Sequence, residues 1–98
     1  MYAITIVFQP LPGRTQELID LSLAIVGPSR AEPDNLFFDV LISEDRNELV
    51  FYEAYADEAG FARHMDAAHT KAWQVQALPM ILESSIRFPA HRSLAPVP

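Results

Sequence analysis

Two neighbouring segments of this sequence are apolar on both faces of a strand, and this limits the folds open to the chain. In residues 36–43, Phe38 points to one face while Phe37 and Leu41 point to the other, and residues 48–56 repeat the pattern. Strands of this kind need cover on both faces. Helices of the same chain can cover only one, so the sequence predicts a second sheet from an identical subunit, in a two-fold homodimer.

The remaining strand and helix signals fit one domain, as expected for 98 residues. Alternation and helical spacing predict strands over 2–9, 36–43, 48–56 and 84–93, and helices over 14–32, 58–66 and 69–83. The β-α-β-β-α-β order predicts an α+β, ferredoxin-like subunit with an antiparallel four-stranded sheet. We expect residues 1–88 to form the domain and the proline-rich residues 89–98 to form an arm that lies along the sheet or crosses to the partner.

Three breaks are expected within the helices. Gly27-Pro28 predicts a kink or a separate last turn in the first helix. Asp57 is a helix cap, and Ala67-Ala68 separates two short helical pieces. Pro79 ends or kinks the last piece.

Composition excludes several classes of partner and chemistry. A net charge of −6 with 7 Lys+Arg leaves no basic stripe for nucleic acid. Cysteine is absent, so there is neither a disulfide nor a thiol nucleophile. No apolar run is long enough to span a membrane, and Met1 is followed directly by a strand-like segment without a basic region. We therefore expect a cytoplasmic protein with no membrane or nucleic-acid partner.

The stretch "FARHMDAAHTKAW" (61–73) holds two histidines and the only tryptophan. On one continuous helix His64 and His69 would lie roughly 140° apart around the axis, which is poor geometry for shared ligation. A break at Ala67-Ala68 would remove the assumption behind that angle. The spacing also differs from the helical zinc-protease motif, so we expect no metal.

Two acidic residues interrupt apolar strands. Asp39 and Glu53 would be partly desolvated there, which raises a carboxyl pKa unless a cation pairs with it. Each could instead lie at a sheet edge or pair with Arg30 or Arg87. We favour that structural interpretation for Asp39 and leave both open for Glu53. Aromatic side chains are concentrated in the same central half, and a pocket lined by several of them would suit a flat, apolar, hydroxylated ligand.

Residues 29–73 resemble the antibiotic biosynthesis monooxygenase family, whose members are dimeric α+β barrels with ferredoxin-like subunits. The resemblance is carried by "SRAEP", "FFDV", "FYEAY", "DEAGF" and the two histidines followed by Trp73, and it extends over about residues 2–88. Asp34 departs from the glycine usual at its position.

The resemblance implies a set of site residues. His64 would be the catalytic base and Glu53 would orient it. The expected substrate-binding residues are Asn35, Phe38, Tyr52, His69 and Trp73. The haem-degrading branch of the family has its axial histidine where this chain has Trp73, a tryptophan at His64, and an asparagine near Ile6, so the resemblance argues against haem.

Two functions from different classes follow from the resemblance. The first is a cofactor-independent monooxygenase acting on a small quinol, phenolic or anthrone-like substrate with molecular oxygen. In that reaction a base removes a proton and the substrate anion reacts with oxygen directly. The second is a dimeric module that only binds a small aromatic ligand. Isomerisation of a small phosphorylated signalling molecule is a third, weaker alternative.

Overall fold

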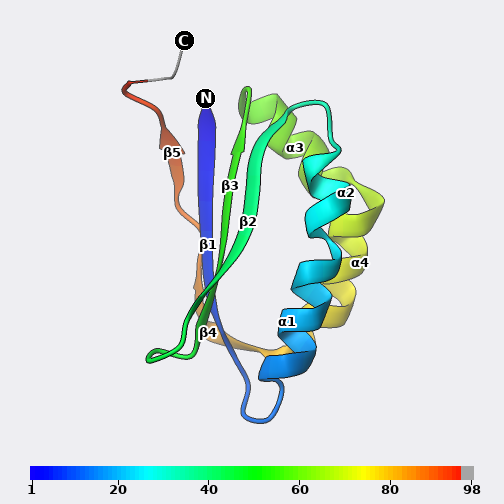
Figure 1. The fold of residues 1–98 in the computed structure, drawn as a ribbon, viewed down its shortest axis with the longest axis vertical. Helices are drawn as coiled ribbons and strands as arrows, with labels where there is room; N and C mark the ends of the chain where they lie inside the picture. The colour runs from blue at the N-terminus through cyan, green and yellow to red at the C-terminus, as the bar shows by residue number, and fades with distance from the viewer. Residues whose placement is uncertain (96–98) are drawn as a thin grey trace.

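The chain folds into two layers, an antiparallel sheet and a layer of helices on one of its faces (Figure 1). The computed structural model describes residues 1–95. The strands are β1 (Tyr2–Pro10), β2 (Asn35–Ser43), β3 (Glu48–Tyr55), β4 (Ile81–Arg87) and β5 (Ala90–Arg92). The helices are α1 (Thr15–Ala24), α2 (Val26–Arg30), α3 (Glu58–Asp66) and α4 (Ala68–Ala77), followed by the 3-10 turn η1 (Leu78–Met80). No helix within the described part has the length and apolarity that crossing a membrane requires.

Strand β1 is the centre of the sheet. The strand order is β2-β3-β1-β4, with β5 also paired to β1, and every pairing is antiparallel. This is the expected ferredoxin-like arrangement, and the predicted α+β fold class is confirmed.

The fourth predicted strand, 84–93, is present as two pieces on the same edge of β1. Strand β4 pairs with the second half of β1, and β5 pairs with the first half in the register Tyr2↔Arg92 (Figure 1). Pro89 lies between the two pieces, where it has no N–H to give to the ladder. Residues 90–92 of the expected arm therefore belong to this chain's own sheet, and residues 96–98 lie outside the described residues.

The first helix breaks two residues earlier than predicted. It ends at Ala24, and a new helix starts at Val26, so Gly27-Pro28 lies inside α2. Pro28 is tolerated there because it occupies the first turn, where a backbone N–H has no partner within the helix. The predicted break at Ala67 is confirmed: its extended backbone, with ψ 147, separates α3 from α4.

The two faces of the sheet differ in cover. Toward the helices, a core forms around Phe8, Leu18, Leu49 and Phe51, all buried. On the other face Tyr52 is 46 % exposed and its ring packs edge-on against Phe37, while no described helix covers this side (Figure 1). The two-sided apolar pattern thus becomes one buried face and one apolar face open to a partner.

Candidate functional site

A cavity of about 530 Å³ lies between the β1–β4 side of the sheet and helices α3 and α4. Its walls are almost entirely apolar. The lining side chains are those of Tyr2, Ile4, Ile6, Phe8, Phe61, Met65, Trp73, Gln74, Leu78, Ile81, Ile86, Phe88 and Ala90. A space of this volume and character suits a flat aromatic molecule.

Few polar groups face this cavity. The indole Nε1 of Trp73 donates to Ser22 Oγ at 3.1 Å, so it is already used, and the Trp73 ring packs against Phe8 and Phe51. Tyr2 and Gln74 are the other lining residues with polar side-chain atoms. The cavity can therefore bind a ligand through its shape and apolar surface, and few of its lining side chains could take part in a reaction.

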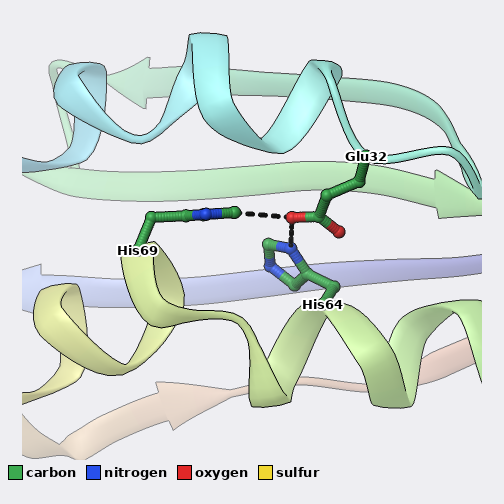
Figure 2. A group of neighbouring side chains, drawn as sticks. All are labelled: Glu32, His64 and His69. Carbon is green, nitrogen blue, oxygen red and sulfur yellow. Dashed lines mark hydrogen bonds and ion pairs between the residues drawn. The ribbon is translucent and has the colours of Figure 1, made fainter.

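A second site, the polar cluster of Glu32, Glu53, Tyr55, His64 and His69, lies among α3, α4, β3 and the loop after α2. Glu32 Oε2 accepts hydrogen bonds from His64 Nδ1 at 2.8 Å and His69 Nε2 at 2.6 Å. Figure 2 shows the two imidazoles, one from each side of the α3–α4 break, turned toward the same carboxylate. One oxygen thus joins two histidines.

Local sequence explains how these groups meet. The extended backbone at Ala67 redirects the chain between His64 at the end of α3 and His69 at the start of α4. The loop that carries Glu32 is tied to α3 by an ion pair of 2.7 Å between Arg63 and Asp34. Gly60 permits this close approach, because a Cβ there would lie 2.7 Å from the Cβ of Asp34. The carboxylate at position 34 thus has a role that glycine could not fill.

Glu53 lies behind His64, on the other side of its ring. Glu53 Oε1 is 3.6 Å from His64 Nε2 and accepts a hydrogen bond from the Tyr55 hydroxyl at 3.0 Å. The residue is 1 % exposed, and its Oε2 has no hydrogen-bond partner within the described residues. Burial raises the pKa of Glu53 to about 7, with the Tyr55 hydrogen bond opposing the shift and the charge of Glu32 adding to it.

The surroundings of His64 favour the neutral form of its imidazole. Burial lowers its pKa, and this effect exceeds the opposing hydrogen bond and charge of Glu32. A carboxylate oxygen can only accept, so Nδ1 carries the ring hydrogen and Nε2 keeps the lone pair. A neutral ring with a free lone pair is the form that a general base requires.

Phe61 connects the cavity and the polar cluster. It lines the cavity, and its ring stacks on the imidazole of His64 with centroids 6.2 Å apart. Ile4, another lining residue, is the cross-strand partner of Glu53. The His64 imidazole is therefore one side chain away from the cavity and does not itself line it.

The expected substrate-binding residues are distributed over several places. Trp73 lines the cavity, while His69 binds Glu32 and Phe38 packs in the core with its ring 5.7 Å from that of His64. Tyr52 is not at the cavity, because strand alternation puts it on the opposite face of the sheet from its neighbour Glu53. Asn35 begins β2, outside the cavity lining, and its amide donates to a backbone carbonyl.

Asp39 has the structural role expected from the sequence, pairing with an arginine: its carboxylate is 4.0 Å from the guanidinium of Arg30. Glu53 has no such ion pair. It is buried, and Arg30 and Arg87 pair with other carboxylates.

Sequence reasoning missed Glu32 and Tyr55. The position of Tyr55 could have been predicted from the sequence. Residues two apart on a strand share a face, and Tyr55 follows Glu53 by two positions. The sequence indicates less clearly that Glu32 belongs to the site, because it is a single acidic residue in the turn before a strand. It meets the histidines only through the tertiary fold.

The separation of roughly 140° expected for one continuous helix does not apply to His64 and His69. That angle assumes one helix, and the break at Ala67 changes the relative direction of the two side chains. One ligand atom from each of Glu32, His64 and His69 lies within 4.8 Å of the others.

Comparison with known proteins agrees with this architecture. The family model for antibiotic biosynthesis monooxygenases matches residues 1–76. The chain belongs to this family. No protein of curated function matches it by sequence.

Solved structures share the whole fold. Rv0793 from Mycobacterium tuberculosis superposes with a TM-score of 0.91 at 24% identity, covering 99% of this chain and 98% of that one. A candidate antibiotic biosynthesis monooxygenase from Nitrosomonas europaea gives 0.91 at 25% identity, covering 97% and 100%. PA3566 from Pseudomonas aeruginosa gives 0.87 at 22% identity, covering 96% and 94%.

Proposed function

We propose that this protein is a cofactor-independent monooxygenase that acts on a small quinol, phenolic or anthrone-like substrate. The observation that carries the proposal is a large apolar cavity next to a buried, neutral imidazole held by a carboxylate. Membership of the antibiotic biosynthesis monooxygenase family supports the same reaction class.

The cavity would bind the substrate through its flat faces. Trp73, Phe61 and Phe88 supply aromatic surface, and Ile6 and Ile86 supply aliphatic walls. Ile6 and Trp73 are two of the positions on which the argument against haem depends, and both face the ligand space as apolar groups. A hydroxylated aromatic ring fits this lining.

His64 would remove the acidic proton through Nε2, and Glu32 would orient it through Nδ1. Glu53, with a pKa of about 7 and Oε1 3.6 Å from Nε2, is placed to exchange that proton. Because Phe61 separates the ring from the cavity, its side chain has to turn when substrate binds.

The substrate anion would then react with dioxygen without a further reductant. One oxygen atom enters a ring carbon as hydroxyl or carbonyl and the other leaves as water with two substrate hydrogens. The substrate supplies all of the electrons.

A homodimer is part of the proposal. The uncovered sheet face carries Phe37, Leu41 and Tyr52, each more than 40 % exposed, an apolar patch that an identical face can cover. Light scattering should give twice the 11.0 kDa of the chain. Leu41→Glu should shift the mass toward the monomer, and a monomeric wild-type chain would contradict the proposal.

Oxygen uptake tests the reaction itself. Purified protein is supplied with a panel of hydroquinones, naphthols and anthrones, with and without air. We expect oxygen consumption above the autoxidation rate, and from at least one compound a product that has gained one oxygen atom and lost two hydrogens, such as a hydroxyquinone from a hydroquinone or an anthraquinone from an anthrone. Ligands that bind without consuming oxygen across the whole panel would contradict it.

That contrary result would favour the second candidate, a ligand-binding module. The binding function is supported by the cavity lining, in which Tyr2 is the only titratable residue within the described chain. The isomerase alternative has less support, since no Lys or Arg among the described residues faces the cavity to hold a phosphate.

A further inference from the structure

We propose that Glu32, His64 and His69 form a binding site for one divalent transition-metal ion of the zinc class. The inference is independent of the proposed oxygenase reaction. It rests on two imidazole nitrogens and a carboxylate oxygen that lie within 4.8 Å of one another (Figure 2).

The three donor atoms lie within 4.8 Å of one another, so small side-chain movements would bring them to the separations that a zinc ion requires. Zinc takes nitrogen and oxygen ligands at about 2.0–2.2 Å in a tetrahedron, which separates ligand atoms by about 3.3 Å. Here Oε2 of Glu32 is 2.8 Å from His64 Nδ1 and 2.6 Å from His69 Nε2. The carboxylate has to retreat by roughly half an ångström, and Glu32 lies in the loop between α2 and β2, outside any helix or strand.

The surroundings of His64 provide a second, independent observation. A metal-binding histidine commonly donates its other ring nitrogen to a carboxylate, which fixes the tautomer and the ring direction. Glu53 is the carboxylate nearest to that nitrogen: Oε1 lies 3.6 Å from Nε2, slightly beyond hydrogen-bond distance, and accepts from the Tyr55 hydroxyl at 3.0 Å. The buried Oε2 of Glu53, which has no partner among the described residues, can also accept a hydrogen.

The chemistry of the donors selects the class of ion. Two imidazoles and one carboxylate suit Zn²⁺, Co²⁺ or Ni²⁺, whereas Mg²⁺ and Ca²⁺ prefer oxygen ligands. Glu32 and His69 are partly exposed, so an ion has a way in, and an exchangeable ligand can complete the tetrahedron. His64 and Glu53 close the opposite side.

An ion would also change what His64 can do, a consequence that rests on the proposed function. Coordination through Nδ1 forces the ring hydrogen onto Nε2, so the nitrogen assigned to proton abstraction loses its lone pair. A bound ion would therefore inhibit the oxygenase.

Titration of the purified full chain tests the site without any substrate. Calorimetry with Zn²⁺ and absorption spectroscopy with Co²⁺ should give one ion per chain at micromolar affinity or tighter, with the visible bands of tetrahedral Co²⁺. Mg²⁺ should give no binding. Circular dichroism of each variant establishes that it is folded.

The variants His69→Gln and Glu32→Gln change partly exposed ligands and should weaken binding more than roughly tenfold, since even supporting residues of a metal site cost that much. His91→Gln is the matched control, because His91 is an exposed histidine on β5, and it should bind like wild type. No stoichiometric binding to wild type at micromolar ion, or equal loss in His91→Gln, would overturn the site. The cluster would then be a pair of hydrogen bonds only.

Discussion

The cavity and the polar cluster lie on the two sides of Phe61 and divide the requirements of a reaction between them. The cavity has volume and aromatic surface, but Tyr2 is its only lining residue with an ionisable side chain in the described chain. The cluster has two histidines and two carboxylates, but its inner members His64 and Glu53 are at most 3 % exposed. In this arrangement the ligand's fit and the base's proton affinity are set by different residues, so they can be changed separately.

The largest effect is expected from removing the base. His64→Gln keeps a hydrogen bond to Glu32 and should lower kcat by about 10²–10⁴-fold with KM nearly unchanged. The control His91→Gln should retain full turnover. A His64→Gln variant that keeps most of its kcat, measured by oxygen uptake, would move the base elsewhere.

Alanine at position 64 is a poorer test of the base than glutamine. Because His64 is buried and contacts both carboxylates, His64→Ala leaves buried acceptors without partners and should also lower stability.

Zinc should inhibit nearly as strongly as the loss of the base. At saturating Zn²⁺ we expect turnover to fall by more than roughly tenfold, because Nε2 of His64 becomes a donor. A chelator should restore the original rate. If stoichiometric zinc leaves turnover unchanged, the metal site stands and the assignment of His64 as base fails.

Glu53 should make the metal-free protein less stable as pH rises. Its native pKa of about 7 lies above the ordinary 4.5, so the native state binds the proton more tightly than the unfolded chain. That stabilisation is complete below pH 4.5 and is lost as pH rises through 7, with a total of about 3 kcal/mol. His64, with its lowered pKa, acts in the opposite sense below its ordinary value of 6.5.

Urea unfolding with chelator between pH 5 and 8 measures this dependence. Glu53→Gln should remove the loss between pH 5 and 8 and leave the acid-side loss due to His64. The titratable groups that face Glu53 are His64, Glu32 and the Tyr55 hydroxyl. If Glu53→Gln keeps the wild-type dependence of stability on pH, a group other than Glu53 is responsible for the loss between pH 5 and 8.

Filling the cavity should have the smallest effect of these changes. It should lower ligand affinity and leave the polar cluster unaltered. Ile86→Trp places a large ring in the ligand space, and we expect ligand affinity to fall by about tenfold or more because overpacking resists binding. Quenching of Trp73 in the cavity wall reports binding in the wild type, and calorimetry serves the variant. A changed pH profile of stability in Ile86→Trp would show that the two sites are coupled.

Sequence pattern was sufficient for the fold and for part of the site. Alternation predicted β2 and β3, and the break at Ala67 was visible as a gap between two helical stretches. The Glu32–His64–His69 contact was not visible, because it joins residues 32 and 37 positions apart through a loop whose path is fixed by Gly60 and Arg63. The split of the last strand was also missed, since Pro89 interrupts a ladder whose register only the neighbouring β1 defines.

The split last strand carries a consequence for how this protein could diversify. The family match ends at residue 76, while five of the residues that line the cavity follow it: Leu78, Ile81, Ile86, Phe88 and Ala90. Glu32, Glu53, His64 and His69 all lie within the matched part. Exchange of the C-terminal segment alone would therefore reshape one wall of the cavity and leave the residues of the polar cluster unchanged.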